Sequence, residues 1–426
     1  MTADTVGYRL TLPLAVLACA LAPAYTVGWH IGFYPNLLEF GILLTVLVFA
    51  WESYHPHPAL PRERGREIFR SDIFRSWFFV ATILLVIAGA ISVIVAPDRR
   101  AALGLFRAYF IEPVLFFLVL INVVRRSRQA FLLVAGLGAG GIVAALLNIA
   151  IVIDALRIRG FDTAQDAPVA VYQTSNAVAL FLVPLIAVAG AVLLHSTSNL
   201  QRRLAALFVA IAGMGVVLSF SRGGYVAMLA VAIGLALSHT RRWWLLAALA
   251  ALVVIAIRVP IIASRLGHEL STTDPRNTLA GRIHLWQATL QMMREHLVFG
   301  TGLSGYAHAM SPWPNGLSQV IYPHNLLLNF WVATGVLGVV AFVVLLIQGF
   351  RMTWRGWKRG EVDWRPFELG VLLALFSMVV HGVVDVPYFK NDLSFEFWVL
   401  MAVAWAGYMA CPHPALPQRG RQASGK

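Results

Sequence analysis

The chain has 426 residues, of which 59% are hydrophobic and only 12% are charged, and its mean hydropathy is +0.74. Soluble domains carry about 25% charged residues, so this composition excludes an ordinary soluble protein and indicates an integral membrane protein. The net charge of +13 does not require a nucleic-acid partner, because short basic loops between membrane spans explain most of it.

Apolar runs of roughly 20 residues recur along the chain, and each is long enough to cross a hydrocarbon core of about 30 Å as a helix. The sequence therefore predicts an all-α, polytopic membrane bundle of about twelve spans. They are expected near 10–27, 33–51, 77–96, 103–124, 130–153, 173–194, 204–220, 223–239, 243–260, 324–349, 367–386 and 393–411. Cys19 and Cys411 lie inside apolar runs, and we expect neither a disulfide nor a metal site from them.

These spans divide the chain into four parts. Residues 1–259 hold spans one to nine, 260–323 form a long polar loop, 324–411 hold the last three spans, and 412–426 form a tail. Most of the 33 Lys and Arg residues fall in segments on the same side as the N-terminus. The positive-inside rule therefore predicts that both termini are cytoplasmic and that the large loop faces outward.

A turn of sequence SRGG joins the seventh and eighth spans at the outer face. Ser221 can cap the following helix, and Gly223 and Gly224 suit a tight turn. Arg222 stands at the head of that helix, where the positive end of the dipole favours a bound anion. The alternative is an arginine that reaches to lipid headgroups.

The long loop contains a predicted amphipathic helix over about 280–298, which could lie over the bundle as a lid or in the outer membrane interface. Its apolar face is expected to consist of Ile283, Trp286, Leu290, Met293 and Leu297.

Arg282 falls at the start of this helix and is the stronger functional candidate, whereas Arg294 near its end is explained by the helix dipole. Arg276 precedes the helix. Tyr306 follows the glycines at 300, 302 and 305, which allow close approach to a ligand. We take both as further substrate-binding candidates.

His324 and Asn325 open the tenth span at the membrane surface. Histidine titrates near neutrality and is the commonest general base, although a lone interfacial histidine is more often structural. Between the last two spans lie His381, Asp385 and Lys390, which together with Asn325 are further substrate-binding candidates. A carboxylate at the end of a span costs free energy, so Asp385 needs a partner or a role, and pairing with His381 or ligand binding are both open.

Together these segments resemble the O-antigen ligase and polymerase superfamily of bacterial envelope enzymes. The resemblance rests on SRGG at 221–224, G-R-x-x-x-W at 281–286 with G-x-G at 300–302, H-N-x-x-L at 324–328, and H-x-x-x-D-x-P at 381–387. It covers roughly residues 205–390.

The resemblance implies a membrane-embedded glycosyltransferase bundle of the C type in the bacterial inner membrane. It also implies that Arg222 and Arg282 bind the pyrophosphate of an undecaprenyl-pyrophosphate-linked O-antigen, that His324 is catalytic, and that lipid A-core is the acceptor. Neither a metal nor a nucleotide cofactor is implied. The residue types agree, because arginine binds phosphate oxygens bidentately without a metal.

Two other functions remain open from sequence. Within the same chemistry, the chain could polymerise O-antigen repeats or transfer glycan to Ser or Thr of periplasmic proteins. It could instead move a lipid-linked glycan across the membrane, although we see no internal repeat of spans and few ionisable residues in mid-helix.

Overall fold

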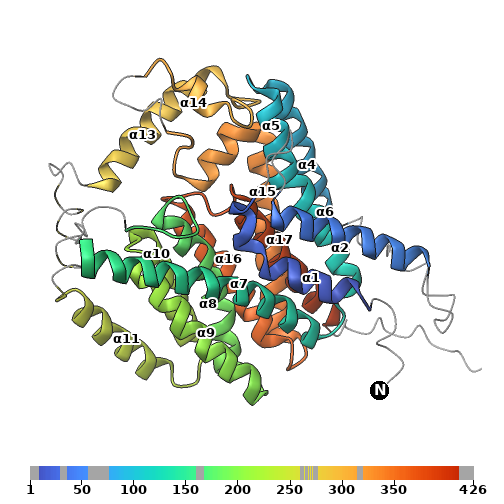
Figure 1. Ribbon diagram of the computed structural model, residues 1–426, viewed down its shortest axis with the longest axis vertical. Helices are drawn as coiled ribbons and strands as arrows, with labels where there is room; N and C mark the ends of the chain where they lie inside the picture. The colour runs from blue at the N-terminus through green and yellow to red at the C-terminus, as the bar shows by residue number, and fades with distance from the viewer. Residues whose placement is uncertain are drawn as a thin grey trace, which may run out of the picture.

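The computed structural model describes residues 9–28, 36–55, 76–159, 167–259, 277–313 and 320–411, together with 263, 267, 269 and 271. Within these residues the chain is helical, and the only β-type pairing is an isolated bridge between Gly28 and Asn36. The predicted all-α, polytopic membrane architecture is therefore confirmed (Figure 1).

The α-helices run in chain order through the bundle. They are α1 (Thr11–Ala20), α2 (Leu37–Tyr54), α4 (Trp77–Val95), α5 (Arg99–Phe106), α6 (Glu112–Val123), α7 (Ser127–Asp154), α8 (Ser175–His195), α9 (Asn199–Leu218), α10 (Arg222–Ser238), α11 (Arg242–Ala256), α13 (Thr278–Met292), α14 (Tyr306–Ala309), α15 (Leu326–Arg359), α16 (Arg365–Gly382) and α17 (Asn391–Ala410). A 3₁₀ turn, Met293–Glu295, extends α13, and a π-helical turn, Arg107–Ile111, joins α5 to α6.

Among the described residues, nine helices are long and apolar enough to cross a membrane. The other three predicted spans correspond to shorter apolar helices, namely α1, α10 and α11 with 10, 17 and 15 residues. At 1.5 Å per residue, α1 covers only about half of a hydrocarbon core. A membrane-embedded bundle is thus clear, whereas the count of twelve full spans stays a prediction.

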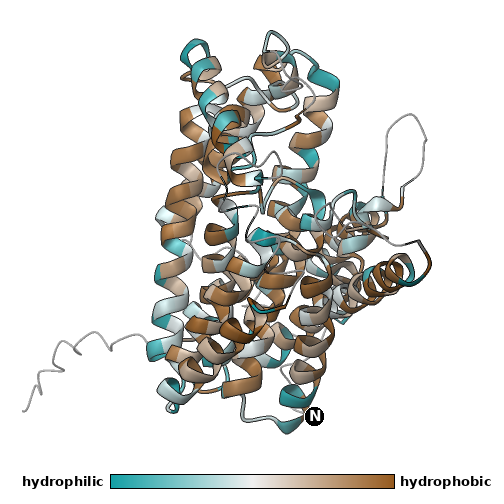
Figure 2. Ribbon diagram, turned by 90° about the vertical axis from the view of Figure 1, so that its left-hand side faces the viewer, coloured by the Kyte–Doolittle hydropathy of each residue, from teal (hydrophilic) through white to brown (hydrophobic). Residues whose placement is uncertain are grey.

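The centre of the bundle is built from α8, α16 and α17, whose residues are mostly buried. Helix α8 and helix α16 approach closely at Gly370, where a Cβ atom would lie 2.6 Å from the Cα of Val188. By contrast, α2, α9 and α11 lie at the periphery and expose apolar side chains, as lipid-facing helices do. Figure 2 shows hydrophobic residues along the long helices and hydrophilic residues gathered toward their ends.

Helices α13 and α14 lie together at one end of the bundle (Figure 1). They share a small core with one residue of α15, and it consists of Leu285, Ala288, Met292, Met293, Tyr306, Met310 and Val332. The predicted helix therefore exists, and of its predicted apolar face Met293 is buried, whereas Ile283, Leu290 and Leu297 are exposed. The helix packs against α14 through Leu285, Ala288 and Met292.

Helix α15 is kinked at Gly335, whose φ of +70° and ψ of −172° are non-helical. The kink receives the chain that follows α13: Val336 N donates to Val298 O at 3.0 Å, and Thr301 N donates to Val332 O at 2.7 Å. A Cβ on Gly335 would lie 2.2 Å from Val298 O. The end of the α13 segment is thereby fixed to the helix that begins just after His324.

Candidate active site

The SRGG turn between α9 and α10 is a capped helix start, as the sequence predicts. The Oγ of Ser221 accepts a hydrogen bond from Gly224 N at 3.2 Å, and Ser219 Oγ accepts one from Ser221 N at 3.2 Å. Phe220, just before the cap, has a φ of +53°, which is strained for a residue with a side chain. The turn is therefore held in one conformation, with Arg222 as the first residue of α10.

Gly223 brings this turn against the end of α16. A Cβ at Gly223 would lie 2.8 Å from both Nε2 and Cδ2 of His381 and 3.0 Å from Cγ2 of Val384. Only glycine permits this approach without displacement. The turn that carries Arg222 thus lies beside the segment that carries Asp385.

Arg222 contacts the start of α13. Its Nη1 lies 2.8 Å from Oε1 of Glu269 and donates to Oγ1 of Thr278 at 2.9 Å. Arg282 lies one helical turn after Thr278 on the same helix. Residues widely separated in sequence, Arg222 and Arg282, are therefore both placed near the first turns of α13.

Asp385 is the centre of the cluster and is 2% exposed. Its Oδ2 accepts from Asn176 Nδ2 at 3.1 Å and lies 3.9 Å from Nη2 of Arg282, while its Oδ1 lies 3.5 Å from Nδ1 of His324. Burial would raise the pKa of this carboxyl, but His324, His381 and Arg282 outweigh burial and hold the pKa below its usual value. Asp385 is thus an ionised group that links one arginine to the histidine.

His324 sits in a constrained backbone position ahead of α15. Its φ is +49°, in the left-handed region, and its ring lies 4.6 Å from the ring of Tyr322. Trp286 Nε1 on α13 donates to Pro323 O at 2.9 Å, which ties this strand of chain to the helix that carries Arg282. Such backbone strain clusters at functional sites, where the surrounding structure maintains it.

The arginine on α13 is largely buried, with 17% of its side chain exposed. Burial lowers the pKa of Arg282, Asp385 and Glu269 raise it, and the nearby Arg222 lowers it further. Arg222 therefore lies close enough to Arg282 for the two guanidinium charges to repel. The 3.9 Å between Nη2 of Arg282 and Oδ2 of Asp385 is longer than a hydrogen bond. Arg282 therefore keeps N–H donors for another partner.

The remaining substrate-binding candidates fall in different places. Asn325 caps α15 by accepting from Leu328 N at 2.9 Å, and its Nδ2 donates to Val383 O at 3.0 Å, so its amide holds α15 to α16. Lys390 directly precedes α17. Burial lowers the pKa of its ammonium group, and this effect outweighs the charges of Asp392 and Asp385, which raise it.

Tyr306 is not brought to the cluster. Tyr306 is 4% exposed, and its hydroxyl is 2.7 Å from Thr289 Oγ1 inside the α13–α14 core. The Tyr306 hydroxyl is paired inside this core because the face of α13 that packs against α14 carries Thr289. Arg276 lies outside the described residues.

Sequence reasoning missed Asn176 and Glu269. Asn176 stands at the head of α8 directly after Ser175, so a polar pair opening an apolar span was the available signal. Glu269 gave no sequence signal, because nothing local distinguishes a loop carboxylate that meets an arginine from one in solvent.

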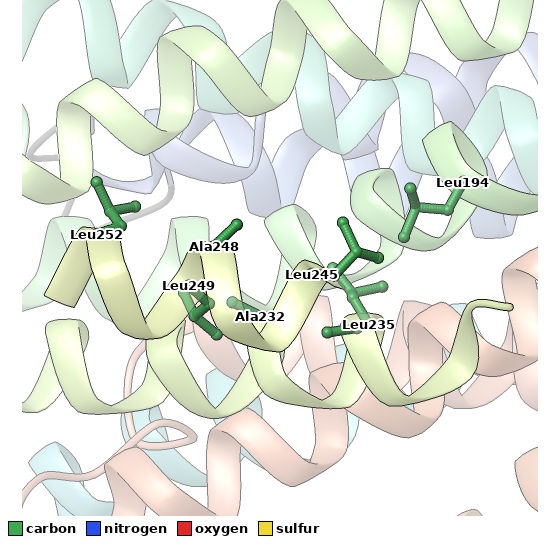
Figure 3. A pocket seen from close by; sticks show the side chains of 8 residues that line it. Leu194, Ala232, Leu235, Leu245, Ala248, Leu249 and Leu252 are labelled. Atoms are coloured by element: carbon green, nitrogen blue, oxygen red, sulfur yellow. The ribbon is translucent and has the colours of Figure 1, made fainter. Parts of the chain in front are cut away.

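A cavity of about 330 Å³ lies elsewhere, between α8, α10 and α11. Figure 3 shows its aliphatic lining, which includes Leu194, Leu235 and Leu252. No group there can bind phosphate or carry a proton. The chemistry of the described residues therefore belongs to the cluster around Asp385 and not to this cavity.

Residues 205–343 match the family model described as O-antigen ligase. That segment contains Arg222, Arg282 and His324, while Asp385 lies beyond it. No curated protein matches the chain. The family supports a ligase- or glycosyltransferase-like enzyme of the O-antigen ligase or polymerase type in lipopolysaccharide biosynthesis, in agreement with the multi-pass membrane architecture. This match over residues 205–343 supports an assignment of the chain to the O-antigen ligase family.

Proposed function

We propose that this protein is an O-antigen ligase, which transfers O-antigen polysaccharide from undecaprenyl pyrophosphate to the lipid A-core oligosaccharide. The reaction breaks the bond between the anomeric carbon and the pyrophosphate oxygen, and it forms a bond from that carbon to an acceptor hydroxyl oxygen. The pyrophosphate leaves with the bonding electrons and the hydroxyl loses its proton. Each of these changes needs a charged group in the site.

At the donor end, Arg222 and Arg282 supply positive charge for the departing pyrophosphate. Charge-assisted hydrogen bonds from guanidinium to phosphate are short and strong, and a low-dielectric site strengthens them further. The two arginines come from different helices and lie near the same end of α13. Because these groups provide the charge, transfer is expected to continue in the presence of EDTA.

At the acceptor end, His324 is the general base. With Nδ1 facing the carboxylate of Asp385, its Nε2 is the nitrogen that accepts the hydroxyl proton, and Asp385 stabilises the imidazolium that forms. A base that acts without forming a covalent intermediate predicts inversion at the anomeric carbon. General-base catalysis of this kind contributes about 10²–10⁴-fold to a rate.

The observation that carries this proposal is that one buried carboxylate, Asp385, lies near both the phosphate-binding arginine and the histidine. A site with cations alone would fit a transport path for an anionic lipid. An imidazole and carboxylate pair beside the cations adds the means to remove a proton.

The proposed location is the bacterial inner membrane, with this cluster facing the periplasm and both termini in the cytoplasm. The positive-inside bias of the sequence supports that orientation. Membrane lipids would then surround the peripheral helices α2, α9 and α11.

The test is transfer by purified protein reconstituted in liposomes, with lipid-linked glycan and acceptor available on the same face. The proposal predicts glycan attached to lipid A-core. Glycan found only on a longer lipid-linked chain would indicate a polymerase, and glycan on Ser or Thr of an added protein would indicate a protein glycosyltransferase. Movement of the donor between leaflets with no new bond would indicate a transporter.

A further inference from the structure

Glu269 is the carboxylate that fills the space between Arg222 and the start of α13. Its Oε1 lies 2.8 Å from Nη1 of Arg222 and accepts hydrogen bonds from Thr278 Oγ1 at 2.8 Å and Thr278 N at 3.1 Å. Its Oε2 accepts from Leu279 N at 3.1 Å. The Glu269 carboxylate thus pairs with one guanidinium and accepts hydrogen bonds from one hydroxyl and from two backbone amides at the start of a helix.

These donors are the kind that bind a phosphate group. Free amides at a helix N-terminus, an arginine and a hydroxyl form an anion site, and a carboxylate uses it with two oxygens where a phosphate offers more. Arg222 also keeps donor capacity, because its Nε is buried and has no hydrogen-bond acceptor among the described residues. The site therefore holds an anion already and can satisfy a larger one.

The backbone of Glu269 is anchored independently of its side chain. Asn277 Nδ2 donates to Glu269 O at 3.0 Å and to Ser271 O at 2.9 Å, while Asn277 Oδ1 caps α13 by accepting from Ala280 N at 2.8 Å. Rotation of the Glu269 side chain can therefore vacate the site while its backbone and the start of α13 stay in place. The carboxylate is 18% exposed, so it has solvent to turn toward.

We infer that Glu269 is an internal occupant of the donor's phosphate position, which a phosphate of the lipid pyrophosphate displaces when it binds Arg222 and the amides of Thr278 and Leu279. This inference rests on the proposed function and adds a specificity device to it. Only an anion that binds these donors more tightly than the Glu269 carboxylate can displace it. Weaker anions and uncharged lipids therefore do not bind at this position. The apparent affinity for donor is lowered by the fraction of molecules in which Glu269 holds the site.

The experiment measures the affinity of undecaprenyl pyrophosphate, without glycan, for the purified full-length protein in detergent. Glu269→Gln removes the competing charge, and we expect binding on the order of tenfold tighter than wild type. Glu269→Asp keeps the charge on a shorter side chain that reaches the amides poorly, so a smaller tightening is expected. Glu295→Gln, at an exposed position after α13, is the matched control and should leave the affinity unchanged.

Unchanged or weaker binding by both Glu269 variants would overturn the inference and leave Glu269 as a helix cap. In that case, wild-type protein that still transfers glycan would keep the proposed function intact. Wild-type protein that neither binds the pyrophosphate lipid nor transfers glycan would instead overturn the proposed function, and the inference with it. If Glu269→Gln fails to fold, the Glu269→Asp comparison decides alone.

Discussion

Nδ1 of His324, at the start of α15, lies 3.5 Å from Oδ1 of Asp385, just beyond the end of α16. This pair couples a residue inside the family match to one outside it. The same carboxylate lies 3.9 Å from Arg282. The proposed base, His324, and a proposed phosphate-binding group, Arg282, therefore both lie near a single buried anion.

Asp385→Asn should reduce glycan transfer by roughly 10²-fold or more, because the imidazolium loses its stabilising charge. The substitution keeps the size of the side chain, and the protein should still insert and fold. Transfer rates of reconstituted protein measure the effect. Asp363→Asn, at an exposed position before α16, is the control and should retain wild-type activity. Normal transfer by the Asp385 variant would remove Asp385 from the mechanism.

The depressed pKa of Asp385 predicts a pH-dependent contribution to stability. A carboxyl whose pKa is lowered by folding stabilises the protein above its unfolded pKa of about 3.9, and this contribution is lost as the pH falls through the folded value. The melting temperature of wild type should exceed that of Asp385→Asn near pH 6. The difference should narrow below about pH 4. A difference that grows on acidification would contradict the assigned ionisation.

Gly223→Ala tests the contact between the SRGG turn and α16. The new Cβ would meet His381 at 2.8 Å, and we expect a destabilisation of about 1–3 kcal/mol together with reduced transfer. Gly213→Ala in α9 is a matched control, since a Cβ there has no neighbour within 4 Å among the described residues. That control should be neutral or stabilising by up to about 1 kcal/mol. Equal thermal shifts in the two variants would show that the contact is unimportant.

Gly335→Ala tests how the α13 segment is fixed to α15. The backbone conformation at Gly335 suits only glycine, so an alanine there should destabilise the fold by about 1–3 kcal/mol. The new Cβ would also clash with Val298 O. We expect a lower melting temperature and weaker transfer, because the chain that places Arg282 is displaced. Gly104→Ala, whose Cβ meets open space, should show neither effect. A wild-type melting temperature and transfer rate in the Gly335 variant would argue against a fixed attachment of the α13 segment to α15.

Sequence reasoning succeeded where the signal is local. The apolar runs located the helices, and the serine before Arg222 identified the cap of α10, because both depend on neighbouring residues. The approach of Arg222, Arg282 and His324 to one end of the bundle agrees with the family resemblance. No spacing along the chain could have shown it.

The features that could not be predicted from the sequence depend on tertiary packing. Helix α13 carries two partly apolar stripes, and only contact with α14 and Val332 decides that Leu285 is buried while Ile283 is exposed. The position of Asp385 between Asn176 and Arg282 was likewise not predictable, since these two neighbours come from distant helices. Tyr306 looked suited to a ligand, but its hydroxyl pairs within a core that local sequence does not reveal.

The most direct measurement compares wild-type and His324→Ala proteins in liposomes for two quantities, donor binding and glycan transfer to lipid A-core. If His324 deprotonates the acceptor, binding of the lipid pyrophosphate should change by less than about threefold, while transfer should fall by about 10²–10⁴-fold. A His324→Ala protein that transfers glycan at the wild-type rate would contradict the account.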